Sequence, residues 1–94
     1  MSYQAKPYPY MTADEARGQI EATEALYRRE VRALKRIYEE LDVTEPRTIK
    51  AMQLRAHVTS QKDFLQVIKR RLDGQRHVLA ECERYERRGG KAWR

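Results

Sequence analysis

Residues 51–82 read AMQLRAHVTSQKDFLQVIKRRLDGQRHVLAEC, and within them apolar side chains recur every seven residues. Two interleaved rows make up this repeat. The first row is Ala51, Val58, Leu65, Leu72 and Leu79, and the second row is Leu54, Gln61, Ile68, Gln75 and Cys82. Positions three and four apart lie on one face of a helix. The repeat therefore predicts one long helix with a coiled-coil-like seam, the stripe of side chains that faces a neighbouring helix.

The apolar face of this helix is wider than a pair of helices needs. Five residues on or beside the seam are candidates for an apolar interface: Phe64, Val78, Leu79, Cys82 and Tyr85. Gln61 and Gln75 are polar, and polar seam residues can fix register and oligomeric state. We therefore expect self-association, with two chains forming a dimeric four-helix arrangement.

The long helix is predicted over residues 46–88. A capping pair that begins at Ser60, and the glycine at position 74, leave room for a kink near residue 60 or 74. The seven-residue repeat nevertheless runs through both positions without slipping. The glycine pair that follows ends the helix, so residues 89–94 are expected to form a flexible basic tail.

A second amphipathic helix is predicted over residues 12–41. Thr12 and Glu15 match a capping box at its start. Its first seam row is Ile20, Tyr27, Leu34 and Leu41. Its other row is interpreted as Glu24, Val31 and Tyr38, in which the glutamate is a misfit.

The two helices are expected to form an antiparallel hairpin. Residues 42–46 contain Pro46, which suits a first helical turn but not a helix interior. Asp42 or Thr44 is the expected cap of the second helix. A short loop makes its two helices antiparallel neighbours, so the fold class is all-α, with one hairpin domain over residues 12–88.

The second helix is predicted to outrun the first. If the two helices keep the same alignment from the loop outward, the start of the first helix lies opposite about residue 76, because both helices rise about 1.5 Å per residue. Four of the apolar candidates, from Val78 to Tyr85, would then project without a covering helix. Residues 1–11, rich in proline and tyrosine, are expected to form an extended arm, and three of its side chains are expected to cover this surface: Tyr3, Tyr8 and Tyr10. A recognition peptide and a disordered arm remain the alternatives.

Composition limits the class of protein. The chain has 94 residues, of which 40% are hydrophobic and 36% charged, and these proportions suit one small helical domain. No apolar run approaches the roughly 18 residues that cross a bilayer, and no signal-peptide pattern is present. One cysteine excludes an internal disulfide. We expect a cytoplasmic protein without membrane contact.

The chain contains no recognisable catalytic or metal-binding motif. His57 and His77 lie twenty residues apart, and neither belongs to a helical metal pair. Glycine-rich phosphate loops, nucleophile elbows and H-E-x-x-H patterns are all missing from the sequence. Cys82 lies on the seam and is interpreted as a small core residue. We expect a protein that is not an enzyme, with no cofactor, no metal and no small-molecule substrate.

The net charge of +6 lies in the second part of the sequence. Residues 1–41 carry seven basic and seven acidic side chains, whereas residues 42–94 carry thirteen and seven. Four of the cations recur every seven residues along one edge of the seam: Arg55, Lys62, Lys69 and Arg76. The edge of the first helix that faces them is interpreted as Glu21, Arg28, Lys35 and Asp42, which would oppose cations to cations. The cationic row either shields the seam with its aliphatic stems or meets a partner.

The C-terminal sequence RYERRGGKAWR interleaves aromatic and cationic side chains. Such a mixture suits single-stranded nucleic acid or an acidic protein groove, although a solvated tail is equally compatible. The candidates for binding a partner or nucleic acid are Arg55, Lys62, Lys69, Arg70, Arg71, Arg76, Arg84, Arg87, Arg88, Lys91, Trp93 and Arg94.

Two function classes follow from these patterns. The first is a non-enzymatic protein-interaction module, an adaptor, assembly factor or inhibitor that binds a larger protein through the apolar end and the cationic edge. The alternative is a nucleic-acid-binding accessory protein without sequence specificity. Short, charged, helical chains of this composition are common among phage and bacterial accessory proteins.

Overall fold

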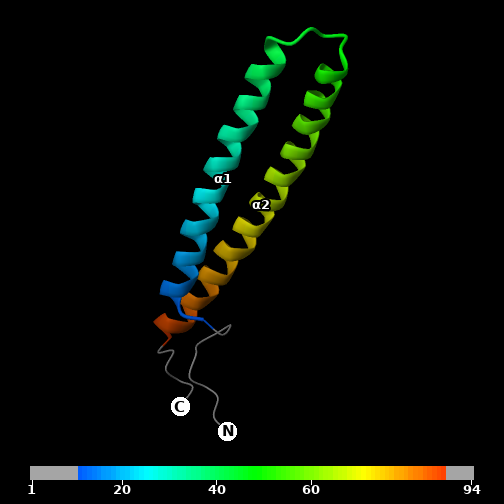
Figure 1. Ribbon diagram of the computed structural model, residues 1–94. Coiled ribbons are helices and arrows are strands. Elements are labelled where there is room, and N and C mark those ends of the chain that lie inside the picture. Colours follow the sequence, from blue (N-terminus) through cyan, green and yellow to red (C-terminus); the bar gives the residue numbers. More distant parts are fainter. Residues whose placement is uncertain (1–10, 89–94) are drawn as a thin grey trace. The chain divides into compact units, whose positions relative to one another are not determined.

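The structure, a computed structural model, describes residues 11–88, which form two helices joined by a loop (Figure 1). Helix α1 spans Ala13–Asp42, helix α2 spans Ile49–Arg87, and no strand occurs among the described residues. The all-α helical hairpin predicted from the sequence is therefore confirmed. Residues 1–10, with the three tyrosines of the predicted arm, and residues 89–94 lie outside the described range.

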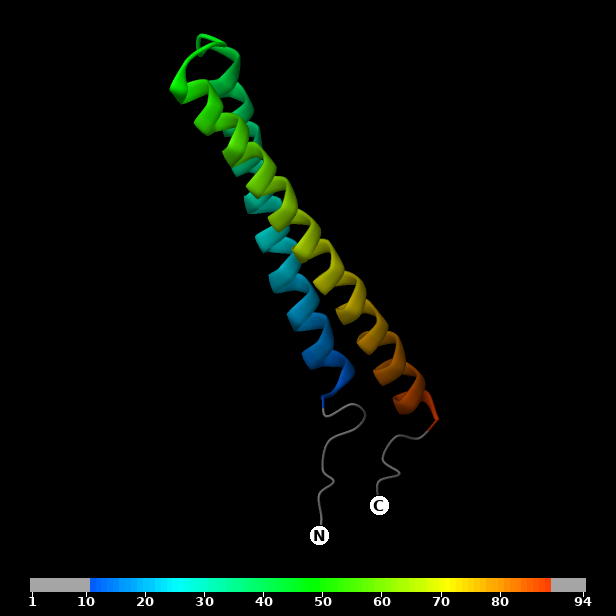
Figure 2. The ribbon, with the colours of Figure 1, turned by 90° about the vertical axis from the view of Figure 1, so that its right-hand side faces the viewer.

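The hairpin divides into two compact units, each with its own contacts. The loop unit is Ala25–Arg70. The terminal unit is Met1–Glu24 with Arg71–Arg94, of which residues 11–24 and 71–88 are described. Within each unit, a segment of α1 runs beside a segment of α2 in the opposite direction (Figures 1 and 2).

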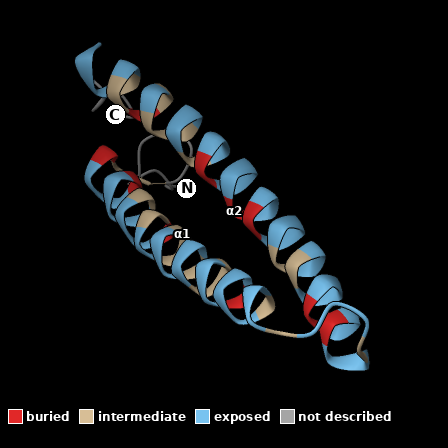
Figure 3. Ribbon diagram, turned by 90° about the horizontal axis from the view of Figure 1, so that it is seen from above, coloured by how far each residue is buried: buried red, intermediate tan, exposed pale blue. Residues whose placement is uncertain are grey.

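The seam predicted for α2 is confirmed by burial, because all ten of its positions are buried or half-buried (Figure 3). The buried seam side chains are Ala51, Leu54, Leu65, Ile68, Leu72 and Cys82. The helix is continuous through Ser60 and Gly74. An unbroken seven-residue repeat keeps one face of the helix against its neighbour along the whole length.

The second seam row of α1 differs from the predicted one. The buried and half-buried residues of that row are Ala16, Thr23, Glu30 and Ile37. Val31 and Tyr38 lie one position further on and are exposed, at 39% and 41%. The prediction was wrong because two rows with the same seven-residue spacing can accompany the row of Ile20 and Tyr27. Apolar character favours the row of Val31 and Tyr38, but the other row is the buried one. Small and polar residues fill the row that is buried.

The start of α1 has the capping box predicted from Thr12 and Glu15. The Glu15 N–H donates to Thr12 Oγ1 over 3.1 Å, and the Thr12 N–H donates to Glu15 Oε1 over 2.9 Å. These bonds satisfy two N–H groups that have no partner inside the helix.

The loop covers residues 43–48. The residue that caps the start of α2 is neither Asp42 nor Thr44, the two residues expected from the sequence. Thr48 is the cap of α2, since its Oγ1 accepts the Ala51 N–H over 3.1 Å. Thr44 instead closes α1, because its hydroxyl donates to the Glu40 carbonyl over 2.7 Å. Helix α2 thus begins at Ile49, after Pro46 rather than at it. Pro46 restricts the residue before it to extended backbone, which suits a loop.

The terminal unit has no uncovered end of α2, so the predicted overhang is wrong. The Ala13 N–H, at the first position of α1, donates to Glu86 Oε2 over 3.0 Å. Cys82 is completely buried, and its Sγ lies 3.5 Å from the Met11 carbonyl oxygen. Val78, Leu79 and Tyr85 are half-buried rather than projecting. The prediction failed because it extended one constant register from the loop, whereas in the terminal unit Ala13 meets Glu86 and Arg17 meets Glu83.

The seam of the loop unit contains one polar contact between the helices. The Gln61 side-chain amide donates to the Glu30 carbonyl oxygen over 2.9 Å and to Glu30 Oε1 over 2.8 Å. Both residues are half-buried. The contact satisfies Gln61 within its own chain, so this glutamine does not require a second copy as a partner.

Gly74→Ala is expected to stabilise the protein. No atom lies within 4 Å of a Cβ placed at Gly74, so the methyl group meets no clash and reduces the backbone entropy of the unfolded chain. We expect the free energy of unfolding to rise by about 0.5–1 kcal/mol. Urea denaturation measures this change. Ala80→Gly, at an exposed position of the same helix, should produce the opposite change, and a destabilised Gly74→Ala variant would contradict the geometry.

Gln61→Ala is expected to destabilise the loop unit, because Glu30 then keeps its partly buried polar groups without the amide. We expect a loss of about 1–3 kcal/mol in the free energy of unfolding. Gln66→Ala removes an exposed glutamine from the same helix and should change stability by less than about 0.5 kcal/mol. Equal losses in the two variants would show that the seam contact contributes nothing.

Candidate functional site

The loop unit carries the excess positive charge of the protein. Ala25–Arg70 contains eleven Lys and Arg residues and six Asp and Glu residues, a net charge of +5. The described terminal unit, residues 11–24 and 71–88, contains six basic and eight acidic residues, a net charge of −2. The division of the charge along the sequence differs from its division between the units, because the terminal unit combines residues from both helices.

The exposed apolar side chains also gather in the loop unit. Among the described residues, the large exposed ones are Val31, Tyr38, Val43, Ile49, Met52, Phe64 and Val67. All seven lie within Ala25–Arg70. Of the five predicted interface residues, only Phe64 is exposed, at 43%. The apolar surface available to a partner is therefore on the loop unit and not at the C-terminal end of α2.

One ion pair establishes which rows of the two helices share a flank of the loop unit. Lys50 Nζ lies 3.0 Å from Glu40 Oε2, and each residue directly precedes a residue of the first seam row. The positions that directly follow the second seam row must then share the opposite flank. On α1 these positions hold Val31 and Tyr38, and on α2 they hold Arg55, Lys62 and Lys69.

The terminal unit shows the same pairing of rows by direct contact. Arg17 and Glu24 follow the second seam row of α1, and Arg76 and Glu83 follow that of α2. The Arg17 guanidinium donates to Glu83 over 3.0 Å, and that of Arg76 donates to Glu24 over 3.1 Å. The heptad positions thus predict correctly which side chains meet.

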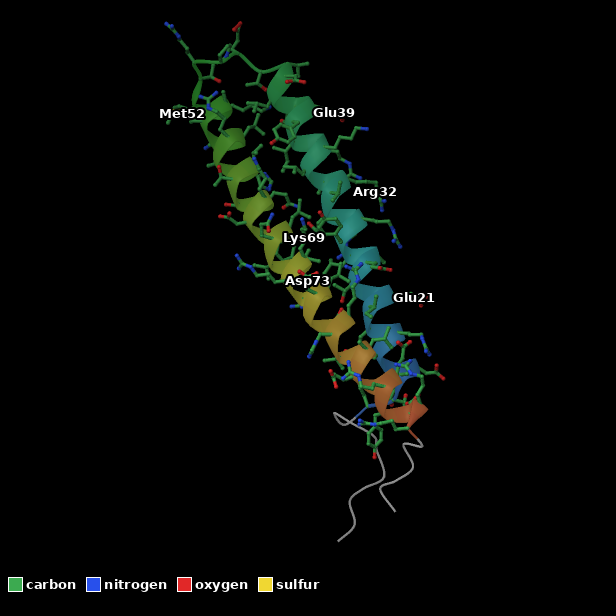
Figure 4. The ribbon with its side chains drawn as sticks, turned by 180° about the vertical axis from the view of Figure 1, so that it is seen from behind. Glu21, Arg32, Glu39, Met52, Lys69 and Asp73 are labelled. Atoms are coloured by element: carbon green, nitrogen blue, oxygen red, sulfur yellow. The ribbon has the colours of Figure 1, made fainter. Side chains whose placement is uncertain are left out.

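The candidate site is the flank of the loop unit that carries Val31 and Tyr38, which we call the cationic flank. It consists of Arg28, Val31, Lys35, Tyr38, Arg55, Lys62 and Lys69, and the row of Arg28 and Lys35 ends at one exposed carboxylate, Asp42. Arg28 and Lys35 lie three residues before Val31 and Tyr38, and are therefore their neighbours on the outer surface of α1. The predicted opposition of Arg28 and Lys35 to the α2 cations is wrong, because Val31 and Tyr38 lie between the two sets. Figure 4 shows Lys69 on α2, and Arg32 and Glu39 on the side of α1 away from α2.

The cations of this flank lack acidic partners. Within residues 11–88, no Asp or Glu forms an ion pair with Arg28, Lys35, Lys62 or Lys69, and Arg55 donates to the Pro46 carbonyl over 3.3 Å. The other flank differs, since Lys50 is paired with Glu40, and Arg29 lies 3.5 Å from Glu30. Of the nine loop-unit cations that form no ion pair within residues 11–88, five therefore lie on this flank.

Other predicted binding residues are divided between paired, exposed and undescribed positions. Arg76 is paired with Glu24, and Arg84 lies 2.6 Å from Glu81, whose pKa this hydrogen bond lowers. Four more predicted cations are exposed: Arg70, Arg71, Arg87 and Arg88. Lys91, Trp93 and Arg94 lie outside the described residues. A shallow open depression of the terminal unit is lined by Arg17, Glu83, Glu86 and Arg87, and three of these side chains already bind within the unit.

The sequence did not predict Val31 and Tyr38 to be surface residues, and it placed Arg28 and Lys35 opposite other cations instead of in a binding site. The signal for both lay in the row of Ala16, Thr23, Glu30 and Ile37, which has the spacing of a seam row but little apolar character. Choosing that row places Val31 and Tyr38 outside the seam.

Within residues 11–88, no group of three or more His, Cys, Asp or Glu residues is arranged to hold a metal ion. Neither α1 nor α2, as described, has the length and apolarity of a membrane-crossing helix.

Comparisons with known proteins give no match for this chain, either among family models, among curated proteins or among solved structures. A functional assignment therefore depends on the surface chemistry of the chain itself. On the cationic flank, five cations without an ion pair among the described residues lie beside two exposed apolar side chains, Val31 and Tyr38.

Cys82 is expected to be unreactive in the folded protein. Its burial raises the pKa of the thiol, and the nearby carboxylates of Glu86 and Glu15 raise it further. Because the thiolate is the reactive form, a disulfide-exchange reagent should modify Cys82 at neutral pH far more slowly in the native protein than in denaturant. Rapid native modification at a rate near that of a free thiol would contradict the buried placement.

Proposed function

We propose that this protein is a non-enzymatic protein-interaction module that binds an acidic protein through its cationic flank. One observation carries the proposal. Five cations of the loop unit, none of them in an ion pair among the described residues, lie beside the exposed side chains of Val31 and Tyr38.

The arrangement favours association with an acidic surface. Clustered charges of one sign repel each other, and an acidic partner relieves this repulsion and speeds encounter. Exposed apolar side chains within such a cluster add area that a partner can bury. The aliphatic stems of Lys62 and Lys69 extend this apolar area, since long cationic side chains pack along it while their charged ends stay in water.

Binding of single-stranded nucleic acid without sequence specificity is the second candidate. The observation in its favour is Tyr38, an exposed ring beside Lys35 and the α2 cations, since bases stack on such rings while cations meet phosphates. The net charge of +5 on the loop unit also suits a polyanion.

The homodimer expected from the sequence is proposed on the opposite flank. Phe64 and Val67 are exposed there, at 43% and 48%, and lie three residues apart on one side of α2. Two cationic flanks would repel each other, which leaves this second flank as the better contact between copies. The cationic flank then stays open in the dimer.

The proposed function is tested by titrating the full chain with poly-glutamate and with single-stranded DNA of matched charge. We expect Lys62→Glu with Lys69→Glu to weaken poly-glutamate binding at least about tenfold, because two attractive contacts become repulsive. The control is Arg32→Glu with Arg36→Glu, which changes the net charge equally at exposed positions off the flank. Equal losses in both variants would remove the cationic flank from the proposal.

The relative affinity for the two probes, compared at two salt concentrations, separates the two candidate functions. Nucleic-acid binding falls steeply between about 50 and 200 mM salt, with a log–log slope of about one unit per neutralised phosphate. DNA binding that exceeds poly-glutamate binding at both salt concentrations would favour the nucleic-acid function. Failure of both probes to bind at the lower salt concentration would overturn both functions.

A further inference from the structure

We propose that the occupant of the cationic flank is an acidic amphipathic helix of another protein, which lies along α1 and α2 as a third helix of the loop unit. This inference rests on the proposed function and specifies the class of partner. It is carried by the spacing of the flank residues, by their order across the flank, and by the contacts that already engage five carboxylates of the terminal unit.

The flank residues repeat with the period of a helix pair. Arg28 and Lys35 are seven residues apart, as are Val31 and Tyr38, and Arg55, Lys62 and Lys69 follow the same interval. Seven residues rise about 10.5 Å along a helix, which is two turns. A partner helix with its own seven-residue repeat presents side chains at this same interval. Adjacent cations in each row would therefore meet carboxylates placed one repeat apart.

The order of the residues across the flank matches an amphipathic helix. The apolar row of Val31 and Tyr38 lies in the middle, with Arg28 and Lys35 on one side and the α2 cations on the other. A helix that packs on this surface would set its apolar stripe on Val31 and Tyr38. Glu or Asp residues on both borders of that stripe would then meet the two cationic rows, as charges beside a coiled-coil seam do.

This order distinguishes a helix from a phosphate backbone. Phosphates can pair with the cations, but a phosphate backbone offers no apolar side chains to cover Val31, which lies among them at 39% exposure. An amphipathic helix satisfies the charged rows and the apolar row together. The helix is therefore the better complement of the whole flank.

The chain itself supplies no acidic segment for this place. Residues 1–10 and 89–94 contain no Asp or Glu. In the terminal unit, Asp14 and Glu83 bind Arg17, and Glu24 binds Arg76. Glu15 and Glu86 accept backbone N–H groups at the start of α1. A second copy keeps other exposed carboxylates, such as Glu21 and Glu39, but each has a cation four residues before it on the same helix, Arg17 and Lys35. Another protein is therefore the better source of an acidic helix.

The test compares two synthetic peptides of identical composition and charge. The first places leucine at the two seam positions of a seven-residue repeat and glutamate on both borders of that stripe. The second permutes the same residues so that no apolar stripe forms. Affinity for the full chain is measured by fluorescence anisotropy, and helix formation by the gain in far-ultraviolet circular dichroism on mixing. Sedimentation verifies that each peptide alone is monomeric at the concentration used.

We expect the amphipathic peptide to bind at least about tenfold more tightly than the permuted one and to gain helicity on binding. Val31→Ser with Tyr38→Ser should abolish most of this difference. Phe64→Ser with Val67→Ser removes exposed apolar area from the other flank and should leave it unchanged. If the Val31 and Tyr38 double variant loses its helical spectrum, the two peptides are compared on Lys62→Gln with Lys69→Gln instead, which alters the α2 row of cations on the same flank.

The outcomes separate this inference from the function on which it rests. Equal binding of both peptides, weakened by Lys62→Glu with Lys69→Glu, would retain an acidic partner but overturn the helix. A preference for the amphipathic peptide that survives Val31→Ser with Tyr38→Ser would also overturn the inference, because the helix would then bind elsewhere. If neither peptide binds and poly-glutamate also fails, the proposed function itself is wrong.

Discussion

A helix in a two-helix hairpin has one neighbour, so it can bury only one stripe of its surface. This constraint determines which side chains of the protein are covered. Leu65, Ile68 and Leu72 lie on the stripe of α2 and are buried, whereas Phe64 and Val67, which are similarly apolar, lie beside it and are exposed. A larger helical domain would cover such residues with a further helix. In the loop unit, large apolar residues beside the seam, such as Phe64 and Val67, therefore belong to the surface.

The repeat of α2 made the fold predictable, because ten seam positions in register leave few alternative faces. The hairpin, the seam of α2 and the capping box at Thr12 and Glu15 all followed from local spacing. The second row of α1 did not, since Thr23 and Glu30 on the seam are less apolar than Val31 and Tyr38 beside it. Hydrophobicity alone favours the wrong row where the buried one is polar.

The candidate site was predictable only in part. The cationic row of α2 could be read from its spacing, and it lies on the surface as expected for Lys62 and Lys69. Its opposite row could not be identified until the seam of α1 was known, because an error of one position moves Arg28 and Lys35 into the place of Val31 and Tyr38. The distribution of charge required the fold as well, since the acidic residues near both ends of the chain come together in the terminal unit.

The contact between Ala13 and Glu86 links the first turn of α1 to the last turns of α2. Helix ends usually fray independently, since their outermost backbone groups have few partners. In this protein, the carboxylate that holds the free N–H of one helix belongs to the end of the other, and Glu83 binds Arg17 one turn further in. The two helix ends should therefore open as one cooperative event. Amide exchange in the first turn of α1 would consequently report the integrity of α2 seventy residues away, and a cleavage near residue 86 would loosen the beginning of the domain as well as its end.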